Sequence, residues 1–194
     1  TNAIDCFNHT PVHYACYHGH DDCVGALTDE DVLWQNTEEN SFGPLHCAAA
    51  QGHDECLQVL FDAASESLDV NGLDALGRAP LHLSAAGGFN DCVRVLTEAD
   101  DFEPDVENGA GNTGLLLAAA NGHHNVCCTL IEFGADYKRD VDGQSVVHLS
   151  LASTAPQSGC QVIKVILDRL ERDGADDEEI ADFLNQLSST GESL

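Results

Sequence analysis

The chain has 194 residues, with 7 Lys and Arg against 34 Asp and Glu, and its formal net charge is −27 at pH 7. Such an acidic surface repels nucleic acid and anionic membranes, so we expect neither as a ligand, and it attracts basic proteins. No apolar run approaches the ~20 residues that a membrane span needs.

A short sequence pattern recurs along the chain and defines the predicted elements. Thr10-Pro11-Val12-His13 is followed by Gly43-Pro44-Leu45-His46 and Ala79-Pro80-Leu81-His82, and degraded copies begin at Thr113 and Ser145. Successive copies begin 33, 36, 34 and 32 residues apart. A period near 33 with this pattern is typical of ankyrin repeats, which the chain resembles. The resemblance implies an all-α ankyrin-repeat solenoid of about five helix-turn-helix repeats.

The residues that begin and end the first helix of each repeat also recur. Proline follows the start in the first three copies and suits the first turn of a helix, where its missing N–H removes no bond. Nine residues after the first four starts comes a glycine, which suits the left-handed conformation that ends a helix. These glycines are Gly19, Gly52, Gly88 and Gly122. An apolar stripe then predicts the second helix.

The fourth and fifth repeats depart from this pattern. The fourth has Gly114 and Leu116 where proline and histidine stand elsewhere, so its first helix lacks a preset φ and a hydrogen-bonding ring. The fifth contains an insertion around residues 154–159, before an apolar run that begins at Val162. We expect a longer loop between its two helices, because lengthening a loop costs little entropy.

The chain divides into repeats and a C-terminal cap. We assign residues 1–174 to the repeats, with starts near residues 10, 43, 79, 113 and 145, and residues 175–194 to an acidic capping helix and tail. Apolar residues of this last segment have helical spacing, and acids fill its first turn. Residues 1–9 resemble the second half of a linker, so we expect the repeats to be part of a longer array.

The nine cysteines indicate a reducing compartment. Cys23, Cys56 and Cys92 occupy equivalent positions in successive repeats, where we expect small, buried, apolar residues, and no paired loop cysteines suggest a disulfide framework. We therefore expect free thiols and a cytoplasmic or nuclear protein. Cys128 is expected to point outward, as an accessible thiol.

Two groups of residues admit both a structural and a chemical interpretation. Four residues of the first repeat resemble zinc ligands, although the repeat pattern itself explains three of them. A histidine near the start of four repeats could be a base, but we expect it to brace the linker by hydrogen bonds. We predict no cofactor, no metal and no catalytic residue, and keep a metal-binding or enzymatic first repeat as an alternative. The two groups are Cys16, His18, His20 and Cys23, and His13, His46, His82 and His148.

The phase of the repeats also predicts a protein-binding surface. In this fold the first helices and the tips of the linkers line a concave face, and their variable positions are the candidates for recognition. The predicted binding residues are Tyr14, Tyr17, His18, Glu38, Glu39, Cys47, Gln51, Asp74, Leu76, Leu83, Leu117 and Asn121.

Residues 13–24 and 36–48 carry a closer resemblance. They resemble late repeats of the long ankyrin subunits of protein phosphatase 6, where an A-C-Y-x-G-H-x-x-C-V helix precedes an E-x-N-x-F-x-P-L-H-C-A start. The resemblance implies a non-enzymatic regulatory scaffold that brings a phosphatase complex to its substrates. The acidity keeps two alternatives open. The chain could mimic nucleic acid and sequester a basic protein, or its charge could serve solubility alone.

Overall fold

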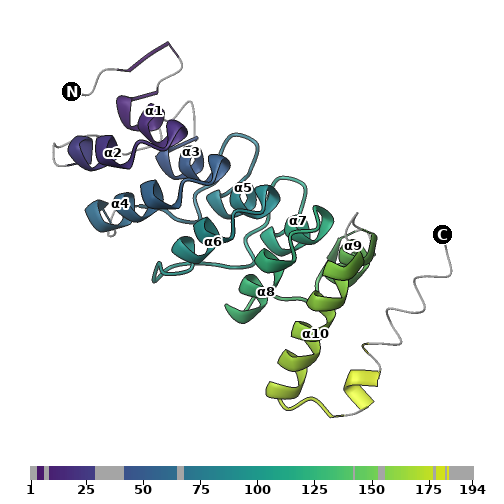
Figure 1. The fold of residues 1–194 in the computed structure, drawn as a ribbon. Helices are drawn as coiled ribbons and strands as arrows, with labels where there is room; N and C mark the ends of the chain where they lie inside the picture. Colours follow the sequence, from purple (N-terminus) through teal and green to yellow (C-terminus); the bar gives the residue numbers. More distant parts are fainter. Residues whose placement is uncertain are drawn as a thin grey trace.

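Five pairs of helices follow one another along an elongated stack (Figure 1). The computed structural model describes residues 4–6, 9–28, 42–64, 68–141, 143–152, 156–176, 178–181 and 183. The pairs are α1 (Pro11–His18) with α2 (Asp21–Thr28), α3 (Pro44–Gln51) with α4 (Asp54–Ala64), α5 (Pro80–Gly87) with α6 (Asn90–Leu96), α7 (Gly114–Ala120) with α8 (His124–Glu132), and α9 (Val146–Ala152) with α10 (Pro156–Arg172). The predicted all-α ankyrin-repeat solenoid is confirmed.

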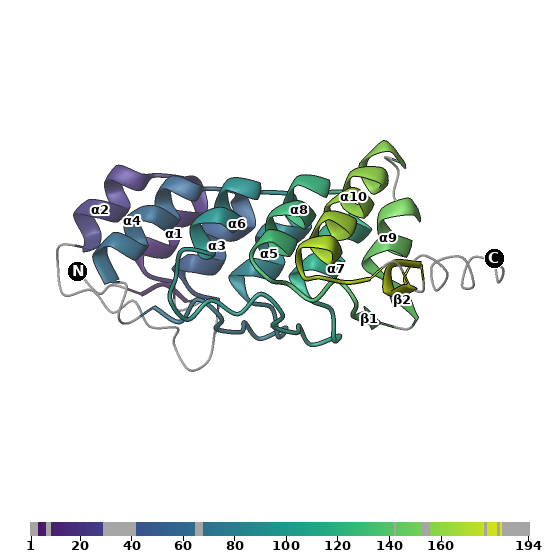
Figure 2. The same cartoon turned by 90° about the horizontal axis from the view of Figure 1, so that it is seen from below.

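The helices form two parallel rows. The first helices α1, α3, α5, α7 and α9 each pack against the next one, and the second helices α2, α4, α6, α8 and α10 do the same. The described residues of the linkers after α4, α6 and α8 project together from one edge of the rows (Figure 2). The buried side chains are shared between neighbouring pairs, because each pair has an apolar surface that it cannot cover alone.

The only strands in the described residues form a short hairpin in the last linker. Residues of β1 (Asp140–Val141) pair with those of β2 (Gln144–Ser145) in antiparallel register. The two preceding linkers close equivalent turns, with bonds of 2.9 Å from Asp74 N to the Arg78 carbonyl and from Asn108 N to the Asn112 carbonyl. The hairpin is therefore another copy of the linker turn.

The first helices end as predicted. Gly19, Gly52, Gly88 and Gly122 all have positive φ, between 71° and 79°, in the left-handed region. A ring from the following repeat also lies over the first three of them. A Cβ added to Gly52 would lie only 2.5 Å from the ring of Phe89. Glycine is therefore required here both for its backbone conformation and for close packing.

The fourth repeat compensates for its missing proline and histidine. The hydroxyl of Thr113 accepts a hydrogen bond from the N–H of Leu116, at 3.4 Å, and caps the start of α7. A Cβ at Gly114 would lie 2.9 Å from the side chain of Leu81. The loss of proline thus lets α7 pack closely against α5.

The insertion in the fifth repeat adds to a helix. Residues 156–159 belong to α10, so the longer loop that we predicted is wrong for them, and residues 153–155 lie outside the described part. A Cβ at Gly159 would lie 2.9 Å from the carbonyl oxygen of Ser150. Glycine therefore lets the first turns of α10 approach α9.

The cysteines follow the prediction only in part. Cys56 and Cys92 are buried as expected, but Cys23 at the equivalent position of α2 is exposed. α2 packs on α1 and α4, and no other described helix covers its remaining side. Cys128, which we expected to point outward, is half-buried, and burial together with nearby Glu132 raises its pKa. Its thiolate is therefore disfavoured.

A short helix follows α10 near the C-terminal end of the described residues. Residues 178–181 and 183 are helical, and Ile180 and Phe183 pack against the core. The ring of Phe183 meets that of Tyr137 edge-on, with centroids 6.2 Å apart. The predicted capping helix thus contacts the linker that follows α8. Residues 184–194 of the predicted segment lie outside the described residues.

Candidate functional site

On one side of each first helix, no other described helix packs against it. In α1 the side chains of Val12, His13, Ala15 and Cys16 are buried, and those of Tyr14, Tyr17 and His18 are exposed. A spacing of three and four residues puts the exposed set on one side of the helix. We call this side, at the same positions in α1, α3, α5 and α7, the first-helix face.

The first-helix face carries most of the predicted binding residues. Four positions after each repeat start lie Tyr14, Cys47, Leu83 and Leu117, of which Tyr14 is 49% exposed and the two leucines are half-buried. Gln51 and Asn121 are exposed on the last turn of α3 and just after α7, and the Asn121 amide donates to the Leu117 carbonyl at 2.9 Å.

The structure brings four of the predicted residues together around one hollow of about 380 Å³. They come from α1 and α3, at the N-terminal end of the first-helix face. Most of the lining surface belongs to carbon atoms and aromatic rings, which is typical of sites that bind side chains or small ligands. The lining residues are His9, His13, Tyr14, Tyr17, His18, Phe42 and Cys47.

Tyr14 is held in place at the edge of this hollow by Asp5. The hydroxyl of Tyr14 donates a hydrogen bond of 2.7 Å to one carboxylate oxygen, and His9 N donates to the other at 2.8 Å. The bond to the carboxylate raises the pKa of Tyr14. The phenol therefore stays neutral, and its ring is fixed before any partner arrives.

Two predicted binding residues are buried. Cys47 is 4% exposed, and burial raises the pKa of its thiol to about 12. Only a small part of its surface lines the hollow. Asp74 is 7% exposed, which removes its carboxylate from any binding surface. Both side chains therefore offer a partner little surface, because tight packing of α3 covers Cys47 and the linker itself uses the carboxylate of Asp74.

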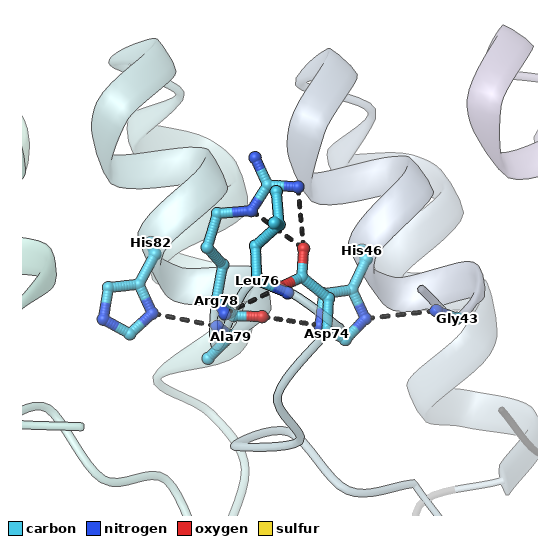
Figure 3. A network of polar contacts seen from close by, with 7 residues as sticks. All are labelled: Gly43, His46, Asp74, Leu76, Arg78, Ala79 and His82. Atoms are coloured by element: carbon cyan, nitrogen blue, oxygen red, sulfur yellow. Dashed lines mark hydrogen bonds and ion pairs between the residues drawn. The ribbon is translucent and has the colours of Figure 1, made fainter. Parts of the chain in front are cut away.

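The carboxylate of Asp74 organises the linker before α5 (Figure 3). One oxygen accepts from the backbone N–H groups of Leu76 and Arg78, at 2.9 and 2.8 Å, and the other accepts from the Arg78 guanidinium. Burial raises the pKa of Asp74, but the bonds from Arg78 and Leu76 outweigh it and the net shift is downward. Leu76 remains 67% exposed at the tip.

The recurring histidines brace the repeats as predicted. The Nδ1 atoms of His13, His46, His82 and His148 accept hydrogen bonds of 2.9 to 3.2 Å from the backbone N–H three residues earlier. A backbone N–H can only donate, so each ring is neutral with its proton on Nε2. The Nε2–H groups of His46 and His82 then donate to the carbonyls of Arg78 and Asn112 in the next linker.

Burial keeps these rings neutral. It lowers the pKa of His13 to about 4, and it also lowers the pKa values of His46 and His82. None of the three is placed as a general base, because each Nδ1 is already occupied by the backbone of its own repeat.

The four residues that resemble zinc ligands do not form a shared site. Cys16 is buried next to Cys47 and Cys56, and burial raises the pKa of its thiol, whereas His18, His20 and Cys23 are exposed. Among the residues that the structure describes, no group of three His, Cys, Asp or Glu side chains is arranged to hold a metal ion.

Sequence reasoning gave His13 of the hollow only a bracing role and missed two further lining residues, His9 and Phe42. Both immediately precede a repeat start, and the prediction considered only the first helices and the linker tips. Their signal is positional: Phe42 precedes α3 and lines the hollow with the neighbouring helix α1, and the ring of His9 contacts His13 and Tyr14 of the helix that it precedes. The predicted residues Glu38 and Glu39 lie outside the described residues. Over the described ranges, no helix combines the length and apolar character that crossing a membrane requires.

A comparison with known protein families agrees with this architecture. A family model for three copies of the ankyrin repeat matches residues 1–71, 30–108, 63–140 and 81–177. Together these overlapping matches run through all five helix pairs. Ankyrin repeats imply a role in protein–protein interaction. The chain belongs to the ankyrin-repeat family.

Proposed function

We propose that this chain is a non-enzymatic scaffold that binds a partner protein through the first-helix face. The observation that carries the proposal is that different side chains serve the packing of the stack and its exposed surface. The bracing histidines are hydrogen-bonded within the stack and five cysteines are buried, whereas Tyr14, Tyr17, Leu83 and Leu117 keep accessible surface along one side. Aromatic and aliphatic groups that project from a rigid framework are typical anchors of interfaces.

The finer role that we propose is that of a regulatory or targeting subunit of a phosphatase-type complex. The support is the resemblance of residues 13–24 and 36–48 to the ankyrin subunits of protein phosphatase 6. We further propose that residues 1–174 are ankyrin repeats and that residues 175–194 form the acidic cap and tail. Five buried free thiols support a cytoplasmic or nuclear location.

A capture experiment followed by measured affinities tests the scaffold. Partners recovered on the immobilised chain are identified, and the Kd of each is measured with a Tyr17→Ala/Leu83→Ala double variant. We expect binding to weaken roughly tenfold or more, as the loss of interface anchors predicts. Arg94→Ala, an exposed change on α6 in the other row, is the control and should leave Kd unchanged. The proposed surface would be refuted by partners whose Kd rises with Arg94→Ala and does not change with the double variant.

A second candidate function, sequestration of a basic protein by an acidic surface, is favoured by one hollow. It measures about 650 Å³ and lies between the end of α4 and the turn after α6, with an apolar floor that includes Phe61. Its rim carries Asp62, Glu98, Asp100 and Asp101. Binding through this hollow should weaken steeply with ionic strength and should be unaffected by Tyr17→Ala/Leu83→Ala, which separates it from binding through the first-helix face.

A further inference from the structure

The hollow of the first-helix face is built from a part of the sequence without lysine or arginine. The sequence has no Lys or Arg before Arg78, and 14 Asp and Glu precede that residue. Arg78 itself is engaged by the buried carboxylate of Asp74, 2.7 Å away. The imidazole of His13 in the wall is neutral, with its pKa lowered to about 4. The electrostatic potential in this hollow is therefore negative.

Aromatic rings line the hollow in fixed orientations. The ring of Tyr14 stands perpendicular to that of His9, with centroids 5.9 Å apart, and the ring of Tyr17 stands perpendicular to that of His18 at 5.2 Å. Both tyrosines remain about half exposed, so their surfaces are open to a ligand. The faces of such rings attract cations, and the attraction grows when water is excluded.

A carboxylate lies beside these rings. Asp5 holds the Tyr14 hydroxyl at 2.7 Å, and its side chain is 27% exposed at the rim. A cation that stacks on Tyr14 would therefore also feel the negative charge of Asp5. The guanidinium group suits this combination best, because it is planar, weakly hydrated, stacks on aromatic faces and pairs with carboxylates.

We propose that this hollow receives an arginine side chain from the partner protein. The inference rests on the proposed function and names the chemical group that anchors the partner. The methylene stem of arginine would lie against Phe42 and the exposed edge of Cys47, while the guanidinium stacks on Tyr14 or Tyr17 near Asp5. A volume of about 380 Å³ holds one such side chain together with atoms of its neighbours.

The chain offers a direct readout because it contains three tyrosines. Tyr14 and Tyr17 line the hollow, and buried Tyr137 at the far end of the stack is an internal control. The protein is labelled with ¹³C-tyrosine and titrated with the blocked tripeptide acetyl-Ala-Arg-Ala-amide. We expect saturable shifts of the Tyr14 and Tyr17 signals and none of Tyr137.

Matched peptides and variants isolate the charge and the ring. The peptide with citrulline, which has nearly the shape of arginine without its charge, should bind about fivefold more weakly, or ~1 kcal/mol. Tyr17→Leu and Asp5→Asn should weaken binding of the arginine peptide, while Tyr17→Phe should preserve it.

Several outcomes would overturn the proposal. These are equal binding of the citrulline peptide, tighter binding of a lysine or leucine peptide, a parallel shift of Tyr137, or no shift at the highest concentration reached. None of them affects the test of the scaffold, which measures whole partners against the Tyr17→Ala/Leu83→Ala variant. Failure of the arginine site and failure of the scaffold are therefore distinguishable.

Discussion

Single residues at the end of each first helix connect one repeat to the next. Gly52 has a φ of 79°, and the space where its Cβ would stand is filled by the ring of Phe89 from the following repeat. The same relation holds between Gly19 and His53 and between Gly88 and His123. A glycine and a ring one repeat later thus act as a pair, and the pair sets how closely neighbouring layers approach.

Substitution at two glycines separates the backbone contribution from the packing contribution. Gly134 also has positive φ, at 94°, but a Cβ added there would meet nothing within 4 Å. We expect Gly134→Ala to cost about 1 kcal/mol of unfolding free energy from its backbone conformation alone. Gly52→Ala adds a clash with Phe89 and should cost at least about twice as much. Chemical denaturation measures both values. Equal costs would show that the ring of Phe89 moves aside without loss of stability.

The bracing histidines make stability sensitive to mild acid. Burial lowers the pKa of His82 below the ordinary value of 6.5, so between its folded and unfolded pKa the unfolded chain binds more protons. The free energy of unfolding should therefore fall as pH decreases from 7 to 5, by up to about 1.4 kcal/mol per pH unit for each such histidine. His13 and His46 contribute in the same direction.

A variant assigns this effect to one residue. His82→Ala removes the acceptor for Ala79 N–H and the donor to the Asn112 carbonyl, and should destabilise the fold by ~1–3 kcal/mol at pH 7. Its stability should also depend less on pH than that of the parent chain. Exposed His20→Ala is the control and should change neither quantity. An unchanged melting midpoint for His82→Ala would contradict the bracing role.

At the scale of helices and linkers, the sequence predicts where elements begin better than what each residue does. The starts of the first helices could be predicted because proline and glycine act through local φ, which does not depend on distant contacts. The exposure of Cys23 could not be predicted, since it depends on whether another helix lies against α2. The role of Asp74 had a signal in its spacing to Gly77, which is typical of a turn that an aspartate closes.

The hollow of the candidate site illustrates the same limit. Its α1 residues follow from helical spacing, because Tyr14, Tyr17 and His18 share one side of the helix. Phe42 and His9 precede repeat starts, and their approach to that side depends on how the linkers fold. The insertion of the fifth repeat was misjudged because its composition suits a loop, while packing against α9 favours a longer α10.

Thiol labelling tests the arrangement of helices element by element. Cys6, Cys23 and Cys160 are exposed, Cys128 is half-buried, and five cysteines are buried. We expect rapid alkylation of the three exposed thiols in the folded chain, slow reaction of Cys128, and reaction of all nine after denaturation. Peptide mapping by mass spectrometry assigns each site. Labelling of Cys56 or Cys92 as fast as Cys23 would contradict the predicted packing of the second helices.

Across the whole molecule, positive charge is scarce and unevenly placed. All seven Lys and Arg stand at or after Arg78, and three of the arginines form ion pairs, with Asp74, Glu107 and Asp173. The first two repeats are therefore an acidic surface with an aromatic hollow in it. This distribution favours a basic partner that approaches from the N-terminal half. The carboxylates there attract positive charges and repel acidic proteins over about 8 Å in physiological salt.

The most direct test of the account is site-specific photo-crosslinking. A photoreactive phenylalanine analogue is placed at Tyr17 or Leu117 on the first-helix face, and at exposed Arg94 or Asn125 on the second row of helices as matched controls. The account predicts that a partner is crosslinked from the first pair of positions and not from the second. Crosslinks that arise only from Arg94 and Asn125 would contradict it, because the recognition surface would then lie on the opposite row.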